Sequence, residues 1–228
     1  MRFSECSRLL DPAPMPLEMG FERLDDGVLH VAIRTDMPRC TGAMFEWWFG
    51  FRPGTREYIW WHPTDHVASE WAETREGTHV GSIHHATERF TGSEPEQLAI
   101  QFRDPAEFFE PEALAAARAA GAVTGLICAH GGPGPEPKRK PDGSVIGTRL
   151  IHLCRDTPWG MALRTHFFMG HDIPGMGAPR AVLEEMFPDD LAPRLLQHCY
   201  DEFSTLARFL PSLYEAERRD QVPPTPPW

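Results

Sequence analysis

The sequence predicts an α+β fold in which a curved antiparallel sheet surrounds one long C-terminal helix. Several segments in the middle of the chain are rich in β-branched and aromatic residues and are bounded by turn residues, as strands are. An apolar repeat of helical period then runs through residues 190–215. The sequence has no internal repeat and no glycine-rich nucleotide-binding signature. A run of strands followed by one long helix therefore favours the α+β class.

The N-terminal part of the chain predicts one strand and two short helices after an irregular lead-in. Residues 1–26 form this lead-in, because three prolines occur near its middle. Residues 27–34 predict the first strand. Residues 41–49 predict a short helix with Thr41 at its N-cap. Residues 56–62 predict a second helix, which ends before a proline because the preceding residue disfavours the α region.

The remainder of the chain supplies most of the predicted sheet and the long helix. Strands are expected over residues 78–90, 97–103, 123–130, 145–154 and 160–169. The other expected elements are a helical insert at 105–120, a Gly/Pro/Lys loop at 131–143, and helices at 179–187 and 190–215. We therefore expect a single domain over residues 27–217, followed by a proline-rich tail over residues 218–228.

Composition and charge exclude several classes of function. The chain has 228 residues and a net charge of −11, without a basic face, so nucleic acid is not an expected partner. No apolar run approaches the ~20 residues of a membrane span, so no membrane partner is expected either. The five cysteines are scattered without a CxxC pair, and the N-terminus lacks the apolar stretch of a signal peptide. We therefore expect a cytoplasmic protein with reduced thiols.

His198 and Glu202 form the first candidate site. In a helix these residues are i and i+4, so both side chains project from one face, one turn apart. An imidazole and a carboxylate at that spacing can chelate one metal ion without distorting the backbone. The same spacing also suits an ordinary surface ion pair, and these two residues alone leave both interpretations open.

The run Trp60-Trp61-His62-Pro63-Thr64-Asp65-His66 is the second candidate site. It places two histidines and an aspartate on a helix end and a proline-shaped turn. Aromatic core packing and local hydrogen bonds to the histidines would explain the run equally well.

A predicted strand over residues 81–89 carries the third candidate site. Because side chains alternate along a strand, His84 and Glu88 share one face, and His85 and Arg89 share the other. An inward-facing Glu88 would need a cation or a hydrogen-bond donor, since burying an unpaired carboxylate is costly.

Imidazole and carboxylate groups suit Zn²⁺, which is typically four-coordinate in proteins. His198 and Glu202 would supply two ligands. The turn that holds His62 and His66, together with Glu88, could supply the others.

Together these residues resemble the 2,4-diacetylphloroglucinol hydrolase family, which includes phloretin hydrolases. The resemblance runs from about residue 44 to the end of the last helix, and its most specific part is the second candidate site. The matching segments are Met44-Phe45-Glu46-Trp47-Trp48-Phe49, Tyr58-x-Trp60-Trp61-His62-Pro63-x-Asp65-His66, Glu88, and His198-x3-Glu202 before Phe203. The resemblance implies a helix-grip fold of the Bet v 1-like or START-like kind and a zinc ion held by two histidines and two glutamates. It also implies hydrolysis of a carbon–carbon bond between an aromatic polyphenol ring and an acyl group.

The resemblance also implies roles for particular positions. The zinc ligands that it implies are His66, Glu88, His198 and Glu202. His66 is preferred to His62 because the family's substrate-binding tyrosine then falls on Tyr58.

Two further assignments follow from the same alignment. Glu94 and Glu96 follow Glu88 closely across a turn and stay open as alternatives to it. His152, on a predicted strand, matches a pocket histidine that assists catalysis in the family.

Two positions depart from the pattern of the enzymes that act on diacetylphloroglucinol. Ser69 aligns with an asparagine, and Phe167 aligns with a tyrosine on the late strand. Losing an amide and a phenol hydroxyl changes which substrate hydroxyls the pocket can match, since an unmatched buried polar group costs ~1–3 kcal/mol. Trp48 is expected to stack on the substrate ring, although Trp47, Trp48 and Trp60 would serve equally well as core.

The prediction is a zinc-dependent hydrolase acting on a small aromatic ketone, which is an acylphloroglucinol-like polyphenol or a related diketone. Zinc would polarise the acyl carbonyl and lower the pKa of bound water, while Tyr58 binds a substrate oxygen and His152 transfers a proton. The alternative is a metal-free helix-grip protein that binds a hydrophobic ligand or guides polyketide cyclisation. That alternative explains the aromatic residues but leaves the four ligands without a role. A homodimer is compatible with the resemblance, but the N-terminal segment is short, so the family's oligomeric state does not carry over.

Overall fold

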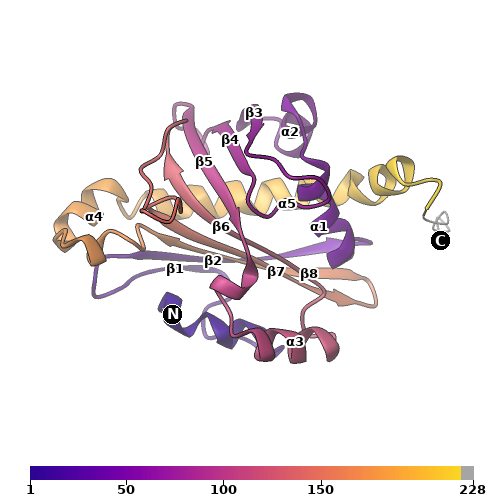
Figure 1. Ribbon diagram of the computed structural model, residues 1–228, viewed down its shortest axis with the longest axis horizontal. Coiled ribbons are helices and arrows are strands. Elements are labelled where there is room, and N and C mark those ends of the chain that lie inside the picture. Colours follow the sequence, from indigo (N-terminus) through magenta and orange to yellow (C-terminus); the bar gives the residue numbers. More distant parts are fainter. Residues whose placement is uncertain (222–228) are drawn as a thin grey trace.

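The computed structural model describes residues 1–221 as an eight-stranded antiparallel sheet packed against one long helix (Figure 1). The strands are β1 (Gly20–Arg23), β2 (Leu29–Pro38), β3 (His66–Ala72), β4 (Ile83–Glu88), β5 (Glu96–Arg103), β6 (Gly125–Pro133), β7 (Thr148–Thr157) and β8 (Gly160–Met169). The helices are α1 (Gly42–Phe51), α2 (Thr55–Trp61), α3 (Pro111–Ala119), α4 (Arg180–Met186) and α5 (Leu191–Glu217), with 3-10 helices η1 (Phe3–Leu10), η2 (Pro105–Glu107) and η3 (Pro174–Met176). Residues 222–228, which hold most of the predicted tail over residues 218–228, lie outside the described residues.

The sheet wraps around α5, and this arrangement confirms the predicted fold class. The strand order is β1-β2-β8-β7-β6-β5-β4-β3, and all neighbouring strands are antiparallel. The 27-residue α5 contributes Leu195, Phe203 and Leu210 to a core that also contains Val31 on β2 and Leu163 on β8. Burial of these apolar side chains is the main favourable term that holds helix and sheet together.

The prediction that residues 1–26 are irregular is wrong, because they form ordered structure on the outer face of the sheet. η1 buries Cys6, Leu9 and Leu10, whose i, i+3 and i+4 spacing makes one apolar stripe. This stripe joins α3 in a second core against sheet residues such as Leu126. β1 then pairs with β2, and Figure 1 shows η1 and α3 on the side of the sheet away from α5. The three prolines follow η1 and so do not interrupt it.

Local signals place the two short helices as expected, but the strand that follows them is not predicted. Thr41 caps α1 by accepting a hydrogen bond from the backbone N–H of Met44 at 3.2 Å. α2 ends before Pro63, as the proline requires. β3 pairs with β4 through a register shift between His66 and Ala68. This bulge breaks the two-residue alternation by which a strand is predicted from sequence.

The remaining predicted elements differ from the structure only at their ends. β4 begins at Ile83, so the strand predicted from residue 78 is shorter than expected. β6 continues to Pro133, so the loop predicted from residue 131 begins later. α4 and α5 confirm the two predicted C-terminal helices.

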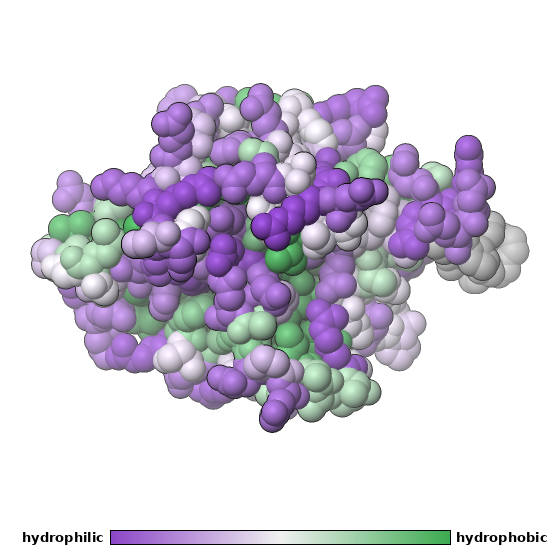
Figure 2. Space-filling view, in the orientation of Figure 1, coloured by the Kyte–Doolittle hydropathy of each residue, from purple (hydrophilic) through white to green (hydrophobic). Residues whose placement is uncertain are grey.

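The surface is hydrophilic over most of the face shown in Figure 2, and apolar residues emerge at the α4 end. Exposed apolar side chains in this region include Met176, Val182 and Met186. Among the helices of residues 1–221, none combines the length and the apolar character that a membrane span requires. The five cysteines are all buried free thiols, as their scattered positions led us to expect.

Several histidines are buried in the fold as neutral imidazoles. Burial lowers the pKa of His84, His130, His152 and His166 to about 3 in each case. His166 lies between strands, where its Nδ1 is 3.0 Å from Nε2 of His30. Because the unfolded chain binds these protons more readily, each histidine ties stability to pH.

We expect the protein to lose stability as the pH falls below the ordinary histidine pKa of about 6.5. The stabilisation from each neutral histidine is fully present above that pH and is lost as the pH falls toward 3, by up to about 1.4 kcal/mol per pH unit. Denaturant unfolding of wild type and His166→Gln between pH 7.5 and 5 measures the contribution of one histidine. The variant should show a shallower decline, and equal declines would contradict this account.

Candidate metal centre

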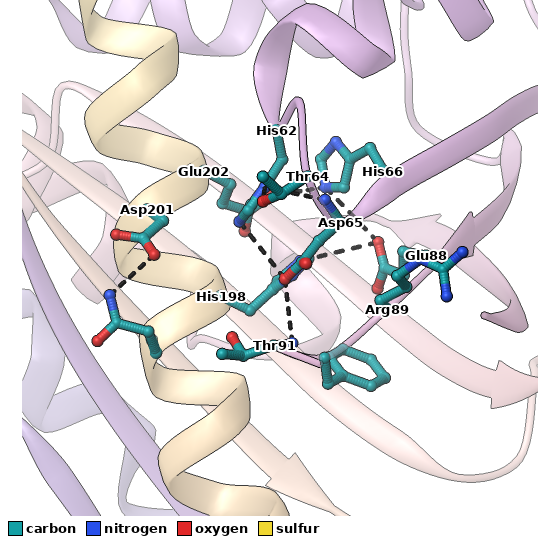
Figure 3. A network of polar contacts seen from close by, with 12 residues as sticks. His62, Thr64, Asp65, His66, Glu88, Arg89, Thr91, His198, Asp201 and Glu202 are labelled. Carbon is teal, nitrogen blue, oxygen red and sulfur yellow. Dashed lines mark hydrogen bonds and ion pairs between the residues drawn. The ribbon is translucent and has the colours of Figure 1, made fainter. Parts of the chain in front are cut away.

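The four residues predicted as zinc ligands converge in the space between α5 and the edge of the sheet (Figure 3). His66 Nε2 lies 3.7 Å from Glu88 Oε2 and 3.6 Å from Glu202 Oε2. His198 Nε2 lies 3.9 Å from the same Glu88 oxygen. All four side chains are buried. Donor atoms of His66, His198 and Glu202 lie within 4.8 Å of one another, close enough to share a metal ion.

Secondary structure explains this convergence. His198 and Glu202 are one turn apart on α5, as their spacing predicts. His66 begins β3 and pairs directly with Glu88 at the end of β4, so both point from neighbouring strands toward the helix. The predicted alternation on β4 is also correct, since His84 and Glu88 are buried on one face.

Hydrogen bonds to the two imidazoles fix which nitrogen faces the site. His66 Nδ1 donates to the backbone carbonyl of Tyr58 at 2.8 Å. His198 Nδ1 donates to Asp65 Oδ2 at 3.0 Å. Each bond places the proton on Nδ1 and leaves Nε2 as the nitrogen directed at the carboxylates. A carboxylate behind a histidine is the usual support of a metal-bound imidazole.

The donor atoms fit a zinc ion. His66 Nε2 is buried, and no hydrogen-bond partner for it exists among residues 1–221. Such an atom is costly to bury unless something else binds it. Ligands bound about 2.0–2.2 Å from a tetrahedral zinc lie roughly 3.3–3.6 Å apart, which is close to the separations around His66. Two imidazoles and two carboxylates are also a donor set that zinc accepts.

The protein's own charges make the site attractive to a cation. Burial raises the pKa of Glu202 to about 8, and the nearby Glu88 adds to this effect while His198 opposes it. Burial alone would lower the pKa of His198, but the hydrogen bond that His198 donates to Asp65 and the carboxylates of Glu88 and Glu202 raise it to about 9. Burial and the neighbouring His198 lower the pKa of His66 to about 2. The two carboxylates therefore favour a positive charge beside them. Without a bound cation, a proton on His198 supplies that charge.

The alternative ligands left open by the sequence fit less well. Glu94 and Glu96 are exposed, whereas Glu88 is buried among the donor atoms. His62 stacks on His198 with ring centroids 4.8 Å apart, and its Nδ1 accepts the backbone N–H of Asp65 at 3.3 Å. His62, Asp65 and His198 form a second group within metal-binding distance, but the Asp65 carboxylate is already bound to His198. This geometry favours Glu88 and His66.

Three of the other predicted site residues, namely Tyr58, His152 and Phe167, line a cavity of about 1000 Å³ whose wall also includes Glu88, His198 and Glu202. The Tyr58 hydroxyl donates a hydrogen bond to Glu88, and its ring stacks on His66 with centroids 3.7 Å apart. His152 Nδ1 is 2.7 Å from Thr165 Oγ1. Burial lowers the pKa of His152 to about 3, so its imidazole is neutral near pH 7.

Trp48 and Ser69 were predicted to contact substrate, but neither lines the cavity. Trp48 is fully buried in the core and packs against Trp61. The Ser69 hydroxyl donates to the carbonyl of Pro53 at 2.8 Å and lies 2.9 Å from His84 Nε2. Ser69 therefore orients His84, which does line the cavity. Ser69 was assigned to the pocket from the family alignment and Trp48 from its aromatic ring, and neither basis indicates how deeply a side chain is buried.

Asp65 is the functional residue whose role the sequence reasoning missed. It holds His198 and also accepts a hydrogen bond from the backbone N–H of Thr91 at 3.0 Å. These bonds join the turn after α2, the end of β4 and α5 at one carboxylate (Figure 3). An aspartate immediately before a ligand histidine was visible in the sequence, but its partner lies 133 residues away.

Comparisons with known proteins identify a family and several relatives that this sequence matches. The sequence model of the DAPG hydrolase PhiG domain matches residues 1–215. A 2,4-diacetylphloroglucinol hydrolase from Pseudomonas protegens is 27% identical over 231 residues, covering 92% of this chain and 72% of the relative. A phloretin hydrolase from Eubacterium ramulus is 26% identical over 215 residues, covering 88% of this chain and 72% of the relative.

Among solved structures, the crystal structure of Ara h 8.0201 aligns with a TM-score of 0.47 and 13% identity, covering 82% of this chain and 99% of the other. The fold class rests on the strand order and the long helix described above. The family match spans nearly the whole described chain and includes all four candidate ligands. The chain belongs to the DAPG hydrolase PhiG domain family of hydrolases.

Proposed function

We propose that this hydrolase is zinc-dependent and cleaves the carbon–carbon bond between an acyl group and an aromatic polyphenol, or the corresponding bond of a related diketone. The observation that carries the proposal is the convergence of His66, Glu88, His198 and Glu202 beside a large apolar cavity. The names of the two relatives support the substrate class, because 2,4-diacetylphloroglucinol and phloretin are both acylated polyphenols.

His66, Glu88, His198 and Glu202 would hold the metal through their Nε2 and carboxylate atoms. A zinc ion there would supply Lewis-acid polarisation of the acyl carbonyl and would lower the pKa of water. Asp65 keeps His198 in the ligating tautomer, and the carbonyl of Tyr58 does the same for His66.

Tyr58 is suited to donate a hydrogen bond to a substrate oxygen. Burial and the adjacent Glu88 carboxylate raise the pKa of its hydroxyl well above the ordinary value, so the phenol stays protonated. The hydroxyl already lies beside the ligand group through its bond to Glu88. The hydroxyl has one proton, so donation to a substrate carbonyl or phenol oxygen near the metal would require the hydroxyl to turn away from Glu88.

His152 is suited to bind a phenolic hydroxyl as a neutral imidazole. Its Nδ1 is engaged with Thr165, so Nε2 remains for a ligand in the cavity. Cleavage transfers the hydroxyl of water to the acyl carbon, and the ring carbon that leaves takes up a proton. A neutral His152 would orient the ring by accepting a hydrogen bond from its hydroxyl, and the proton taken up by the ring carbon would come from the hydrolytic water. The ring carbon is a poor leaving group unless it is protonated.

Other expectations from the sequence stay predictions. The proposed partner is a small aromatic ketone. A cytoplasmic location fits the five free buried thiols, because disulfides are rare in that compartment. A homodimer stays a prediction about the assembly.

Zinc content tests the proposal directly. Protein purified without a histidine tag should contain close to one zinc per chain and release the carboxylic acid from acylphloroglucinols. A His198→Ala/Glu202→Ala variant should lose both properties, because it removes half of the donor set. Gln197→Ala/Asp201→Ala is the matched control, since these residues have the same spacing on α5 and form an exposed hydrogen bond at 2.8 Å. Wild-type protein without tightly bound metal would favour the metal-free ligand-binding alternative.

Replacement of Asp65 should weaken zinc binding without removing a ligand. Asp65→Asn removes the negative charge behind His198, and loss of such support typically lowers metal affinity about 10–100-fold. Competition with a chromophoric chelator gives the zinc Kd. As the control, Asp201→Asn removes a carboxylate that lies next to Glu202 in the sequence but is not a proposed ligand, and it should leave the Kd unchanged. A wild-type Kd in Asp65→Asn would exclude this supporting role.

Replacement of His152 should lower turnover while zinc content stays intact. His152→Ala removes a proposed hydrogen-bond acceptor of the phenolic hydroxyl, and we expect kcat to fall about 100-fold or more. Because His152 stays neutral in the wild-type protein, the pH profiles of kcat for wild type and variant should have the same shape near pH 6.5. His130→Gln, a buried histidine on the outer side of the sheet, is the control. Unchanged kcat in His152→Ala would remove the residue from the mechanism.

A further inference from the structure

The cavity extends well beyond the metal ligands, toward α4. It follows α5 from Glu202 and His198 through Leu195 to Leu191 and reaches Met186 at the end of α4. The seven residue steps from His198 to Leu191 cover about 10 Å of helix. An acetyl group bound at the ligands would occupy only the first part of this length.

The two ends of the cavity differ in chemistry. Beside the ligands, the wall combines aromatic rings such as Phe49 and Phe102 with the polar groups of Tyr58, His84 and His152. Those are groups that stack on a phenol ring and bind its hydroxyls. The polyphenol therefore belongs at this end.

The outer part of the cavity is aliphatic. Its wall includes Leu150, Met169 and Leu191. Thr148 also lines it, but its hydroxyl is directed at the Met169 sulfur at 3.8 Å. Methionine side chains adapt to flexible apolar ligands. Two further polar side chains line the cavity: Arg194, whose guanidinium already binds Asp190 at 2.9 Å, and Glu96, which is exposed at the start of β5. Neither is a free buried partner for a polar group in the middle of an acyl chain.

We infer that the site selects polyphenol ketones with a long, apolar acyl arm, about as long as an octanoyl chain, which lies along α5 toward α4. This inference rests on the proposed function, because it assigns the acyl side of the cleaved bond to the outer cavity. The opening beyond it is apolar as well, since Met176 and Met186 are exposed at the α4 end (Figure 2). Glu136 and Lys138, on the loop between β6 and β7, also line the cavity, so this part of its wall is polar.

We expect kcat/KM to depend on the length of the acyl chain. Each methylene that moves from water into the aliphatic wall should improve kcat/KM about fourfold. The gain should end once the arm reaches the exposed opening. An ether oxygen in place of a methylene in the middle of the acyl chain keeps the shape of the chain but has no hydrogen-bond donor to bind it. It should therefore cancel the gain in kcat/KM from several methylenes.

The test is a series of acylphloroglucinols with acetyl, butanoyl, hexanoyl and octanoyl groups, assayed on the zinc-loaded enzyme. We expect kcat/KM to rise about fourfold per methylene. Leu191→Trp should reduce the octanoyl-to-acetyl ratio at least tenfold by filling the outer cavity. Val182→Trp, on the exposed side of α4 and outside the cavity, should keep the wild-type ratio. A flat or falling series in wild type would overturn the inference, as would an unchanged ratio in Leu191→Trp.

A binding measurement separates this inference from the proposed reaction. Alkylresorcinols with the same chain lengths have no acyl bond to cleave, and their Kd can be measured by calorimetry. If no ketone is hydrolysed but the Kd tightens about fourfold per methylene, the hydrolytic proposal fails and the apolar arm site stands. A Kd independent of chain length would overturn the arm site even if acetyl substrates are hydrolysed.

Discussion

Glu88 and Glu202 bring two carboxylates into one buried site, and much of the surrounding structure compensates for this. Burial raises the pKa of Glu202, and like charge from Glu88 adds to the penalty. Positive charge between them relieves both effects, whether it is a proton on His198 or a metal ion. The donors around the site act in the same direction, since the Tyr58 hydroxyl binds Glu88. The two carboxylates are therefore stable in this buried site only while these partners are all present.

The rest of the fold supplies the rigidity that this set requires. His66 and Glu88 are paired across β3 and β4, and α5 is held by an apolar core that extends along its length. η1 and α3 cover the other face of the sheet with a second core. Both faces of the sheet are therefore packed, and the polar site occupies one end of an otherwise apolar interior. Residues on such elements keep a fixed geometry more easily than residues on loops.

The features that could be predicted from sequence are those that depend on local periodicity. The spacing of His198 and Glu202 and the alternation on β4 specify direction, whereas the choice of one set of four ligands came from the family resemblance. The role of Asp65 was not, because it depends on a turn that meets α5 only in three dimensions. Trp48 and Ser69 were misplaced since their depth depends on packing. The bulge at His66 concealed β3, and the stripe of Cys6, Leu9 and Leu10 was overlooked beside the prolines.

The bond between Asp65 and His198 also bears on how the chain folds. These residues are separated by 133 positions, and almost the whole sheet is formed by the chain between them. Closing so long a loop loses more chain entropy than closing a local turn, so the site can be completed only after the strands have paired. A metal bound there would hold the two ends of that loop together in the native state and would have no equivalent site in the unfolded chain. The reaction centre would thus also act as a late cross-link of the fold.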